Sequence, residues 1–466
     1  MTTDTSVERF QPFADKMQSE GLPDIVIANF KNHYQQLLDG FTGFIPESTI
    51  QTIDALPNAD DLNQQHLALG KAALPTTVLI KLNGGLGTSM GLNKAKSLIN
   101  VKQNYSFLDI IVQHAIHSQV HLLLMNSFNT REDTHNVLRN YPALNTTKLA
   151  LDFLQHKVPK IKQDDLTPAV STDNRQLEWC PPGHGDIYIA LLTSGMLDSL
   201  LNANYRYALI SNSDNLGATL DTRLLGFMVE NQIPFLMEVT DRTEADKKGG
   251  HLTRLPDGKF VLRESAQCMD EDRKAFEDIH LHRYFNTNNL WIDLQKLQDT
   301  LKNKNNILDL PLIRNRKTVD PGDAGSDPVY QLETAMGSAI SVFDGAQAIR
   351  VPRSRFAPVK TTNDLLLMRS DVFELTENYT LASKMAHSNM PVINLDRDFY
   401  GLIDLFEARF PHGAPSLLEC ERLHVEGDIV FGDNIIIKGK VQLQNNSGQQ
   451  VSAPDNTCID KDIIWD

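Results

Sequence analysis

The segment that most constrains the fold is VLIKLNGGLGTSMGLNKAKS, residues 78–97, in which a short apolar run ends in a glycine-rich turn. The turn contains Gly84, Gly85, Gly87 and Gly91, and Lys94 and Lys96 follow it. Glycine has no Cβ, so a phosphate or a base edge can approach the backbone N–H groups closely. Lysines just downstream add positive charge for an anionic ligand. The segment therefore predicts a strand followed by a nucleotide-binding loop.

The loop does not fit the two most familiar nucleotide motifs. A P-loop requires glycine six residues before its lysine and directly before it. Before Lys96, those positions hold Met90 and Ala95. A dinucleotide fingerprint starting at Gly85 continues to Gly87 but meets Met90 where its third glycine should be. Taken alone, the loop could equally be a tight structural turn.

Composition sets the size and the electrostatics. At roughly 150 residues per domain, a chain of 466 residues holds about two or three domains. The 44 lysines and arginines and 59 aspartates and glutamates give a net charge of −15. Such acidity argues against a non-specific partner of nucleic acids or anionic membranes, because both attract basic surfaces. An anionic substrate must therefore be held by local cations, backbone N–H groups and a metal ion.

Cysteine usage and the N-terminus indicate the compartment. Cys180, Cys268, Cys420 and Cys458 are widely spaced and form no CxxC pair, which is typical of neither a zinc site nor a disulfide framework. The first residues lack the basic and apolar regions of a signal peptide. No apolar run approaches the length of a membrane span. We expect a cytoplasmic protein without membrane segments.

The first part of the chain, residues 1–75, has a polar and helical pattern. An apolar stripe at helical spacing consists of Val26, Phe30, Tyr34, Leu37 and Leu38. This pattern predicts a helical N-terminal region that covers the main domain.

In residues 76–375, apolar runs alternate with helical patterns. Strands are expected at 78–82, 121–125, 207–210, 234–239 and 290–292, and helices at 108–117 and 187–199. This alternation predicts an α/β domain with a mainly parallel sheet. Ligands of such sheets bind at the carboxyl ends of the strands. The glycine loop and the polar segment SNSDN, residues 211–215, are both expected at that edge.

The last part, residues 376–466, contains a six-residue period. Two apolar registers and one register of turn residues share this period, namely Leu423, Ile429, Ile435 and Val441; Val425, Phe431, Ile437 and Leu443; and Gly427, Asp433 and Gly439. The shared period favours a short parallel β-helix over an antiparallel hairpin. An open end of such a coil is a plausible contact surface for a homo-oligomer.

Several segments together resemble the eukaryotic-type UTP–glucose-1-phosphate uridylyltransferases, also called UDP-glucose pyrophosphorylases. They are LNGGLGTSMG (82–91), LLMNSFNT (123–130), PPGHGD (181–186), SNSDNLGA (211–218), FNTNNLW (285–291), QLETAMGSAI (331–340) and VPRSRFAPVKTTNDLLL (351–367). The resemblance implies a Rossmann-like nucleotidyltransferase domain followed by a left-handed parallel β-helix. Related hexosamine enzymes usually carry GGxGTRLG in the loop, whereas this chain has Thr88-Ser89-Met90-Gly91, which favours glucose 1-phosphate.

The reaction implied by the resemblance is attack by glucose 1-phosphate on the α-phosphorus of UTP, with loss of pyrophosphate. A sugar phosphate is already mostly dianionic at neutral pH, so no catalytic base is required. Positioning and charge neutralisation are required instead, and lysines and Mg²⁺ supply them. The resemblance implies that Lys360 and Lys96 are the catalytic lysines and that Asp214 binds the metal.

The remaining site residues are also carried over from the family. The residues implied for the nucleotide are Leu82, Asn83, Gly84, Gly85, Lys96, Gln155, Gly183, Asp214 and Lys360. Gln155 would read the uracil edge, since an amide both donates and accepts hydrogen bonds. The residues implied for the sugar phosphate and its hydroxyls are Gly84, Gly85, His184, Asn212, Ser213, Asp214, Asn288 and Glu333.

The chain departs from the family where the loop ends. The family commonly has Gly-Pro before the lysine, whereas this chain has Lys94-Ala95. Proline fixes φ near −65°, so we expect a looser path after the loop here. Two other functions stay open at this point: a pyrophosphorylase for a different sugar 1-phosphate, and a non-catalytic sensor of nucleotide sugars. Retention of Lys96, Asp214 and Lys360 together argues against the sensor.

Overall fold

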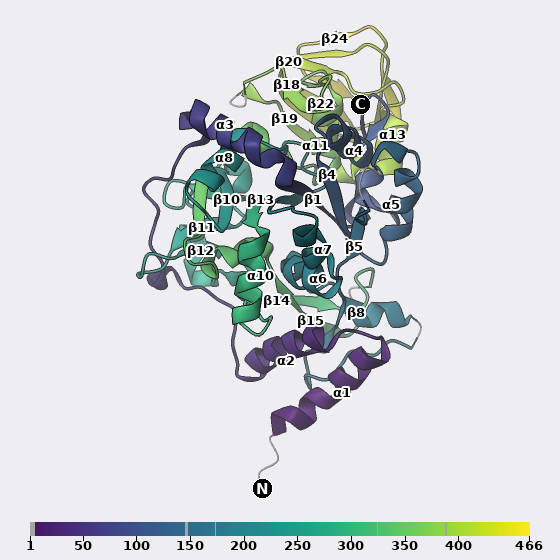
Figure 1. Cartoon of the computed structure of the whole chain (residues 1–466). Coiled ribbons are helices and arrows are strands. Elements are labelled where there is room, and N and C mark those ends of the chain that lie inside the picture. The colour runs from purple at the N-terminus through teal and green to yellow at the C-terminus, as the bar shows by residue number, and fades with distance from the viewer. Residues whose placement is uncertain (1–4, 145–147, 173, 324, 387–388) are drawn as a thin grey trace.

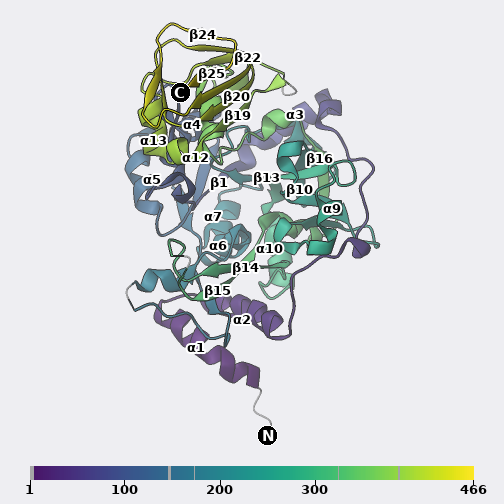
Figure 2. The same ribbon diagram turned by 180° about the vertical axis from the view of Figure 1, so that it is seen from behind.

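The computed structural model describes residues 5–144, 148–172, 174–323, 325–386 and 389–466. Its elements form three tiers (Figure 1). The first two helices lie at one end, the large sheet with its covering helices lies in the middle, and the C-terminal strands lie at the other end. The view from behind shows the same order (Figure 2).

The central sheet has a parallel core. Its strands are β1 (Thr77–Asn83), β4 (His121–Asn126), β5 (Asp152–Leu154), β9 (Tyr207–Asn212), β10 (Phe235–Asp241), β11 (His251–Arg254), β12 (Phe260–Arg263), β13 (Tyr284–Asp293) and β16 (Gln347–Arg350). The order runs β12-β11-β13-β9-β1-β4-β5, and β10 pairs with both β13 and β16. Strands β9, β1, β4 and β5 pair in parallel, while β13 is antiparallel to β9 and β10. The predicted α/β fold with a mainly parallel sheet is confirmed, with antiparallel strands on one side.

Helices cover both faces of this sheet. They are α4 (Phe107–His117), α5 (Arg131–Leu138), α6 (Ile187–Thr193), α7 (Met196–Asn202), α8 (Thr222–Glu230), α10 (Leu294–Asn303) and α11 (Thr362–Arg369). Alternate residues of β1 point to opposite faces, so Val78 and Ile80 join one apolar cluster and Leu79 joins the other. The helix expected at 187–199 is in fact two helices. Gly195 adopts φ 70° between them, a left-handed conformation that ends the first helix.

The N-terminal region is helical only in part. It contains α1 (Thr5–Ser19), α2 (Asp24–Leu38) and α3 (Gln64–Ala73). The predicted stripe on α2 is largely buried, since Val26, Phe30, Tyr34 and Leu37 all lie in the core. Residues 39–63 are not α-helical, because Pro46 and Pro57 interrupt any helix there.

Smaller sheets surround the core. Their strands are β2 (Asn100–Lys102), β3 (Tyr105–Ser106), β6 (Val158–Pro159), β7 (Ile161–Lys162), β8 (Trp179–Cys180), β14 (Leu312–Thr318) and β15 (Pro328–Thr334). The segment before β14 and the residues around β6 and β8 lie beside the N-terminal helices. Lys16 of α1 forms an ion pair with Glu178, and Lys157 forms one with Glu20 at 2.6 Å. Among the described residues, no helix is both long and apolar enough to cross a bilayer.

The C-terminal strands pair mainly in parallel. The elements are β17 (Phe373–Leu375), β18 (Leu381–Ser383), β19 (Val392–Leu395), α12 (Arg397–Tyr400), α13 (Ile403–Arg409), β20 (Ser416–Glu426), β21 (Ile429–Phe431), β22 (Ile436–Asn445), β23 (Val451–Ala453), β24 (Cys458–Ile459) and β25 (Ile463–Trp465). Strand β22 pairs in parallel with β20, β24 and β25, and β21 pairs in parallel with β23. The register joins Leu423 to Val441 and Val425 to Leu443, members of the predicted six-residue period. This parallel pairing excludes the antiparallel hairpin.

Candidate active site

The glycine loop folds back on itself after β1. Leu86 and Ala95 form an antiparallel bridge, and the N–H of Gly87 donates to the carbonyl of Lys94 at 3.4 Å. The N–H of Lys96 donates to the carbonyl of Gly85 at 3.1 Å. These contacts close the loop, so that Lys96 lies beside the first glycines although it follows them by several residues.

Gly84 and Gln155, two predicted nucleotide contacts, lie against each other. A Cβ on Gly84 would be 2.9 Å from Oε1 of Gln155, so a larger residue here would require this amide to shift. The N–H of Gln155 donates to the carbonyl of Asn126 at 2.9 Å, which fixes the residue at the carboxyl edge of β4. A Cβ on Gly85 would meet nothing within 4 Å. The loop therefore has one glycine packed under an amide and one facing open space.

The predicted residues Leu82 and Asn83 are largely committed to internal contacts. The carbonyl of Leu82 accepts the N–H of Ser213 at 3.1 Å. The side-chain nitrogen of Asn83 donates to Asn126 Oδ1 and Thr134 Oγ1, both at 2.8 Å. These bonds hold the glycine loop against the neighbouring strand ends.

Lys96 and Asp214 form an ion pair, with 2.6 Å between Nζ and Oδ2. Both side chains are mostly covered, at 18% and 19% exposed. Asp214 follows β9 in the segment predicted to lie at the carboxyl edge of the sheet, next to β1. The parallel pairing of these strands brings the predicted lysine and the predicted metal ligand into contact.

The segment that carries Lys360 is bound to the Asp214 segment by backbone contacts. The N–H of Val359 donates to the carbonyl of Asp214 at 3.2 Å, and the N–H of Ala357 donates to Oδ1 of Asn215 at 2.9 Å. Lys360 itself is exposed, and no ion pair or hydrogen bond of its Nζ occurs among the described residues. Its charge lies near half-buried Glu264, whose pKa is raised by desolvation and partly lowered again by Lys360.

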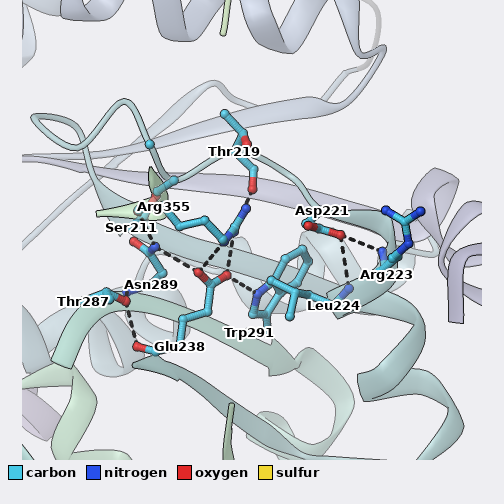
Figure 3. Close-up of polar contacts among 12 residues, drawn as sticks. Ser211, Thr219, Asp221, Arg223, Leu224, Glu238, Thr287, Asn289, Trp291 and Arg355 are labelled. Atoms are coloured by element: carbon cyan, nitrogen blue, oxygen red, sulfur yellow. Dashed lines mark hydrogen bonds and ion pairs between the residues drawn. The ribbon is translucent and has the colours of Figure 1, made fainter. Parts of the chain in front are cut away.

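The other cations of this basic segment are paired, unlike Lys360. Arg353 forms an ion pair with Asp246 at 2.6 Å. Arg355 is buried and donates to both carboxylate oxygens of Glu238, at 2.6 and 2.7 Å (Figure 3). Trp291 and Asn289 also donate to Glu238, at 2.8 and 3.1 Å. The segment is thus anchored by its arginines and leaves its lysine free for a ligand.

Gly183, His184 and Glu333 form a second group of predicted residues. Gly183 has φ 81°, and a Cβ there would be 2.4 Å from the carbonyl oxygen of Thr334 and 3.0 Å from Cβ of Glu333. Nδ1 of His184 accepts the N–H of Met336 at 2.9 Å. Burial lowers the pKa of His184 to about 4, so the imidazole is neutral and its other nitrogen carries the proton. The group thus combines the neutral imidazole of His184 with Glu333, whose Cβ lies against Gly183.

The remaining predicted residues lie on the adjacent strands. Asn212 ends β9 and is half-buried, and Ser213 follows it. Asn288 lies in a bulge of β13, where it adopts φ 57° and accepts a hydrogen bond from Asn286 at 2.9 Å. Gly337 follows Met336, which bonds to His184, and it also lies against this bulge. A Cβ on Gly337 would be 3.1 Å from the side-chain nitrogen of Asn286.

The residues around Asp214 fit a magnesium ion. Oδ1 of Asp214 is buried and has no hydrogen-bond partner in the described part of the chain, which leaves one carboxylate oxygen available. No group of three or more His, Cys, Asp or Glu side chains among the described residues could hold a metal ion by itself. Mg²⁺ is commonly bound by one or two carboxylates together with substrate phosphates and water. The donor set matches that mode of binding.

Sequence reasoning missed three groups near the site: the buried residues Glu238 and Lys81 and the half-buried Glu264. Glu238 and Glu264 belong to no motif. Lys81 lies in the predicted strand before the glycine loop, but its partners are distant in sequence.

A looser path was expected after the glycine loop, at Ala95. Its φ of −54° lies within the range of proline, and its N–H, which proline would lack, donates to Asp133 Oδ2 at 3.1 Å. Alanine thus keeps the turn and gains one hydrogen bond.

A glycine loop, two lysines and a carboxylate at the carboxyl edge of a parallel-cored α/β sheet are the features expected of a nucleotidyltransferase. A family model described as UTP–glucose-1-phosphate uridylyltransferase matches residues 27–438. The chain belongs to this family.

Relatives of known name and structure match almost the whole chain. The UTP–glucose-1-phosphate uridylyltransferase of Saccharomyces cerevisiae is 36% identical over 96% of this chain and 91% of its own length. That of Hordeum vulgare is 39% identical over 94% and 92%. A variant of UDP-glucose pyrophosphorylase from Leishmania major, in complex with UDP-glucose, superposes with a TM-score of 0.90 at 41% identity over 98% of this chain and 99% of that chain. A Trypanosoma brucei structure titled UDP-glucose phosphorylase superposes with a TM-score of 0.89 at 43% identity over 98% and 100%.

Proposed function

We propose that this enzyme transfers UMP from UTP to glucose 1-phosphate, giving UDP-glucose and pyrophosphate. The observation that carries the proposal is the convergence of Lys96, Asp214 and the Lys360 segment beside the glycine loop, with 2.6 Å between Lys96 and Asp214. This reaction gathers negative charge on the α-phosphate and on the departing pyrophosphate. Preorganised cations that stabilise this charge lower the barrier.

Each group of residues then has a role. The amide of Gln155, packed over Gly84, reads the uracil edge. Lys96 and Lys360 contact the triphosphate from the two sides of the loop, while Asp214 holds the metal. Mg²⁺, when bound, neutralises phosphate charge and orients the phosphates. The available Oδ1 of Asp214 supports this assignment.

The second group receives the sugar phosphate. His184 donates from its free ring nitrogen to the phosphate of glucose 1-phosphate, and its neutral state leaves this donor unchanged at neutral pH. Glu333, Asn288, Asn212 and Ser213 contact the sugar hydroxyls or the ribose. The backbone of Gly183, Gly84 and Gly85 approaches the substrates without a Cβ in the way.

The chain is divided, in this proposal, into a helical region (1–75), a nucleotidyltransferase domain (76–375) and a C-terminal domain (376–466). The C-terminal parallel strands are a short left-handed β-helix, supported by the Leu423–Val441 register. Its last strand exposes Ile464 at 58%, which supports contact between copies of the chain. Four unpaired cysteines support a reducing, cytoplasmic location.

The proposal is tested by measuring pyrophosphate release from UTP with glucose, galactose and N-acetylglucosamine 1-phosphates, each with Mg²⁺ and with EDTA. We expect release that requires both substrates and the metal and is fastest with glucose 1-phosphate. Faster turnover of another sugar 1-phosphate would assign a different sugar. Binding of UDP-glucose without any turnover would indicate a sensor instead.

A further inference from the structure

Lys81 is a buried lysine with no role in the reaction described so far. It lies on β1, only 2% exposed, one residue before Leu82 at the start of the glycine loop. Its neighbour across the parallel pairing with β9 is Ser211. Its side chain lies on the face of the sheet covered by α4 and α8, together with Leu79.

The ammonium of Lys81 joins the two ends of one loop. Its Nζ donates to Ser211 Oγ at 2.8 Å and to the carbonyl oxygen of Ala218 at 2.9 Å. Ser211 lies three residues before Asp214 on β9, and Ala218 lies where the loop turns back toward α8. Lys81 thus joins the two ends of the segment that carries Asn212, Ser213 and Asp214.

Stability alone does not account for a lysine here. Among the described residues, no carboxylate lies within ion-pair distance of Lys81, and an unpaired buried cation opposes folding. Burial, reinforced by the nearby Arg355, lowers the pKa of Lys81 to about 7, while Asp214 and Glu238 act in the opposite direction. Its neighbour Leu79 is fully buried on the same face, so an apolar side chain would suit the strand. The fold alone therefore does not require a lysine at this position.

We propose that Lys81 is a positioning residue, which clamps the 211–218 loop so that the free carboxylate oxygen of Asp214 is held ready for the divalent cation. The inference rests on the proposed function. The clamp acts from beneath, through Ser211 and Ala218, and needs no contact with substrate. Lys96 restrains the same carboxylate from the other side, through Oδ2. Together they leave Oδ1 as the oxygen available to the cation.

The test compares Lys81→Met with Ser211→Ala and with the control Lys160→Met. Lys160 is another buried lysine, 3% exposed, whose Nζ donates to the carbonyl of Val319, outside the proposed site. Titration calorimetry measures the Kd of UTP with Mg²⁺ and with EDTA for each variant, and the rate of UDP-glucose formation is recorded in parallel. Thermal unfolding shows whether each variant is folded.

We expect Lys81→Met to abolish the gain in UTP affinity that Mg²⁺ gives the unaltered enzyme, and to raise the half-saturating Mg²⁺ concentration at least tenfold. UTP affinity in EDTA should stay within threefold. Ser211→Ala, which removes one of the two partners, should give a smaller change of the same kind. It also keeps the test decisive if Lys81→Met does not fold. Lys160→Met should leave the Mg²⁺ dependence unchanged.

The inference is overturned if folded Lys81→Met keeps the Mg²⁺-dependent gain, if Lys160→Met loses it equally, or, where Lys81→Met is unfolded, if Ser211→Ala behaves as the unaltered enzyme does. Failure of the proposed function gives a different result. In that case the unaltered enzyme itself forms no UDP-glucose from UTP and glucose 1-phosphate.

Discussion

Lys96 and Asp214 neutralise each other across 2.6 Å, one from the glycine loop and the other from the end of the neighbouring strand β9. They are 118 residues apart in sequence. In the proposed function, Lys96 binds the triphosphate and Asp214 binds the metal through Oδ1, the oxygen that Lys96 does not contact. The ion pair would then couple the binding of the metal to the binding of the triphosphate.

This coupling gives opposite predictions for the two partners. Asp214→Asn removes the metal ligand and frees Lys96, so kcat should fall by at least about a hundredfold while UTP binding in EDTA is retained or tightened. Lys96→Met removes a charge-assisted contact worth about 1.5–3 kcal/mol, so UTP binding should weaken roughly tenfold to a hundredfold. Calorimetry with and without Mg²⁺ separates the two effects.

Lys94→Ala is the matched control for this experiment, because Lys94 is an exposed lysine in the same loop. Its Kd for UTP should stay within about threefold of the unaltered enzyme. Equal weakening by Lys94→Ala and Lys96→Met would mean that the loop contributes only diffuse charge.

Lys360→Ala should reduce kcat by a factor that corresponds to about 2.7–4 kcal/mol, a typical effect of removing one preorganised group. Folding should be unaffected, since the side chain is exposed and its backbone is held by Asp364, which accepts the N–H of Lys360 at 2.8 Å. Steady-state kinetics and thermal unfolding check both points. Lys259→Ala, an exposed lysine 3.9 Å from Asp344, is the control. Near-normal turnover of Lys360→Ala would remove this residue from the mechanism.

The buried pair Arg355–Glu238 anchors the segment that carries Lys360. Arg355→Met leaves Glu238 buried without its cation, which typically destabilises a protein by about 3–5 kcal/mol. The double variant Arg355→Met/Glu238→Gln removes both charges and should be less destabilised than Arg355→Met alone. Urea unfolding of the single and double variants measures the difference. Additive losses would show that the two charges do not depend on each other.

The pH dependence of stability can be assigned to a particular buried histidine. Burial lowers the pKa of His33 from 6.5 to about 4, with Asp309 acting in the opposite direction. Between these values the unfolded chain binds a proton that the folded chain does not, so stability falls as the pH falls from about 6.5 toward 4. The loss attributable to His33 between pH 7 and pH 5 is about 2 kcal/mol. In urea unfolding at both pH values, His33→Leu should lose correspondingly less stability than the unaltered protein. An equal loss of stability between pH 7 and pH 5 in the two proteins would contradict the assignment.

Much of the sheet could be predicted because its strands are continuous apolar runs. The strand at 78–82 became β1 with one more residue at each end, and the glycines after it marked the loop correctly. The apolar pattern predicts a single helix at 187–199, but Gly195 divides it into α6 and α7. A glycine inside an apolar helical pattern is therefore a candidate helix end.

The partners of the site residues could not be predicted. Glu238 and Arg355 are 117 residues apart, and only the order of the strands brings them together. Glu264 belongs to no motif, and Lys81 lies in the predicted strand before the glycine loop, where the sequence does not show which groups its ammonium contacts. Sequence reasoning finds the residues that face a ligand more readily than the residues that hold those side chains in place.

The most direct test of the account is to follow the phosphorus atoms with glucose 1-phosphate whose phosphate group carries heavy oxygen. Phosphorus NMR of the reaction with UTP and Mg²⁺ identifies each product and its label. The account predicts equal amounts of UDP-glucose and pyrophosphate. The label should be on the sugar-side phosphorus of UDP-glucose and on the oxygen that bridges its two phosphorus atoms, and pyrophosphate should carry none. Labelled pyrophosphate, or conversion of UTP to UMP and pyrophosphate without UDP-glucose, would contradict it.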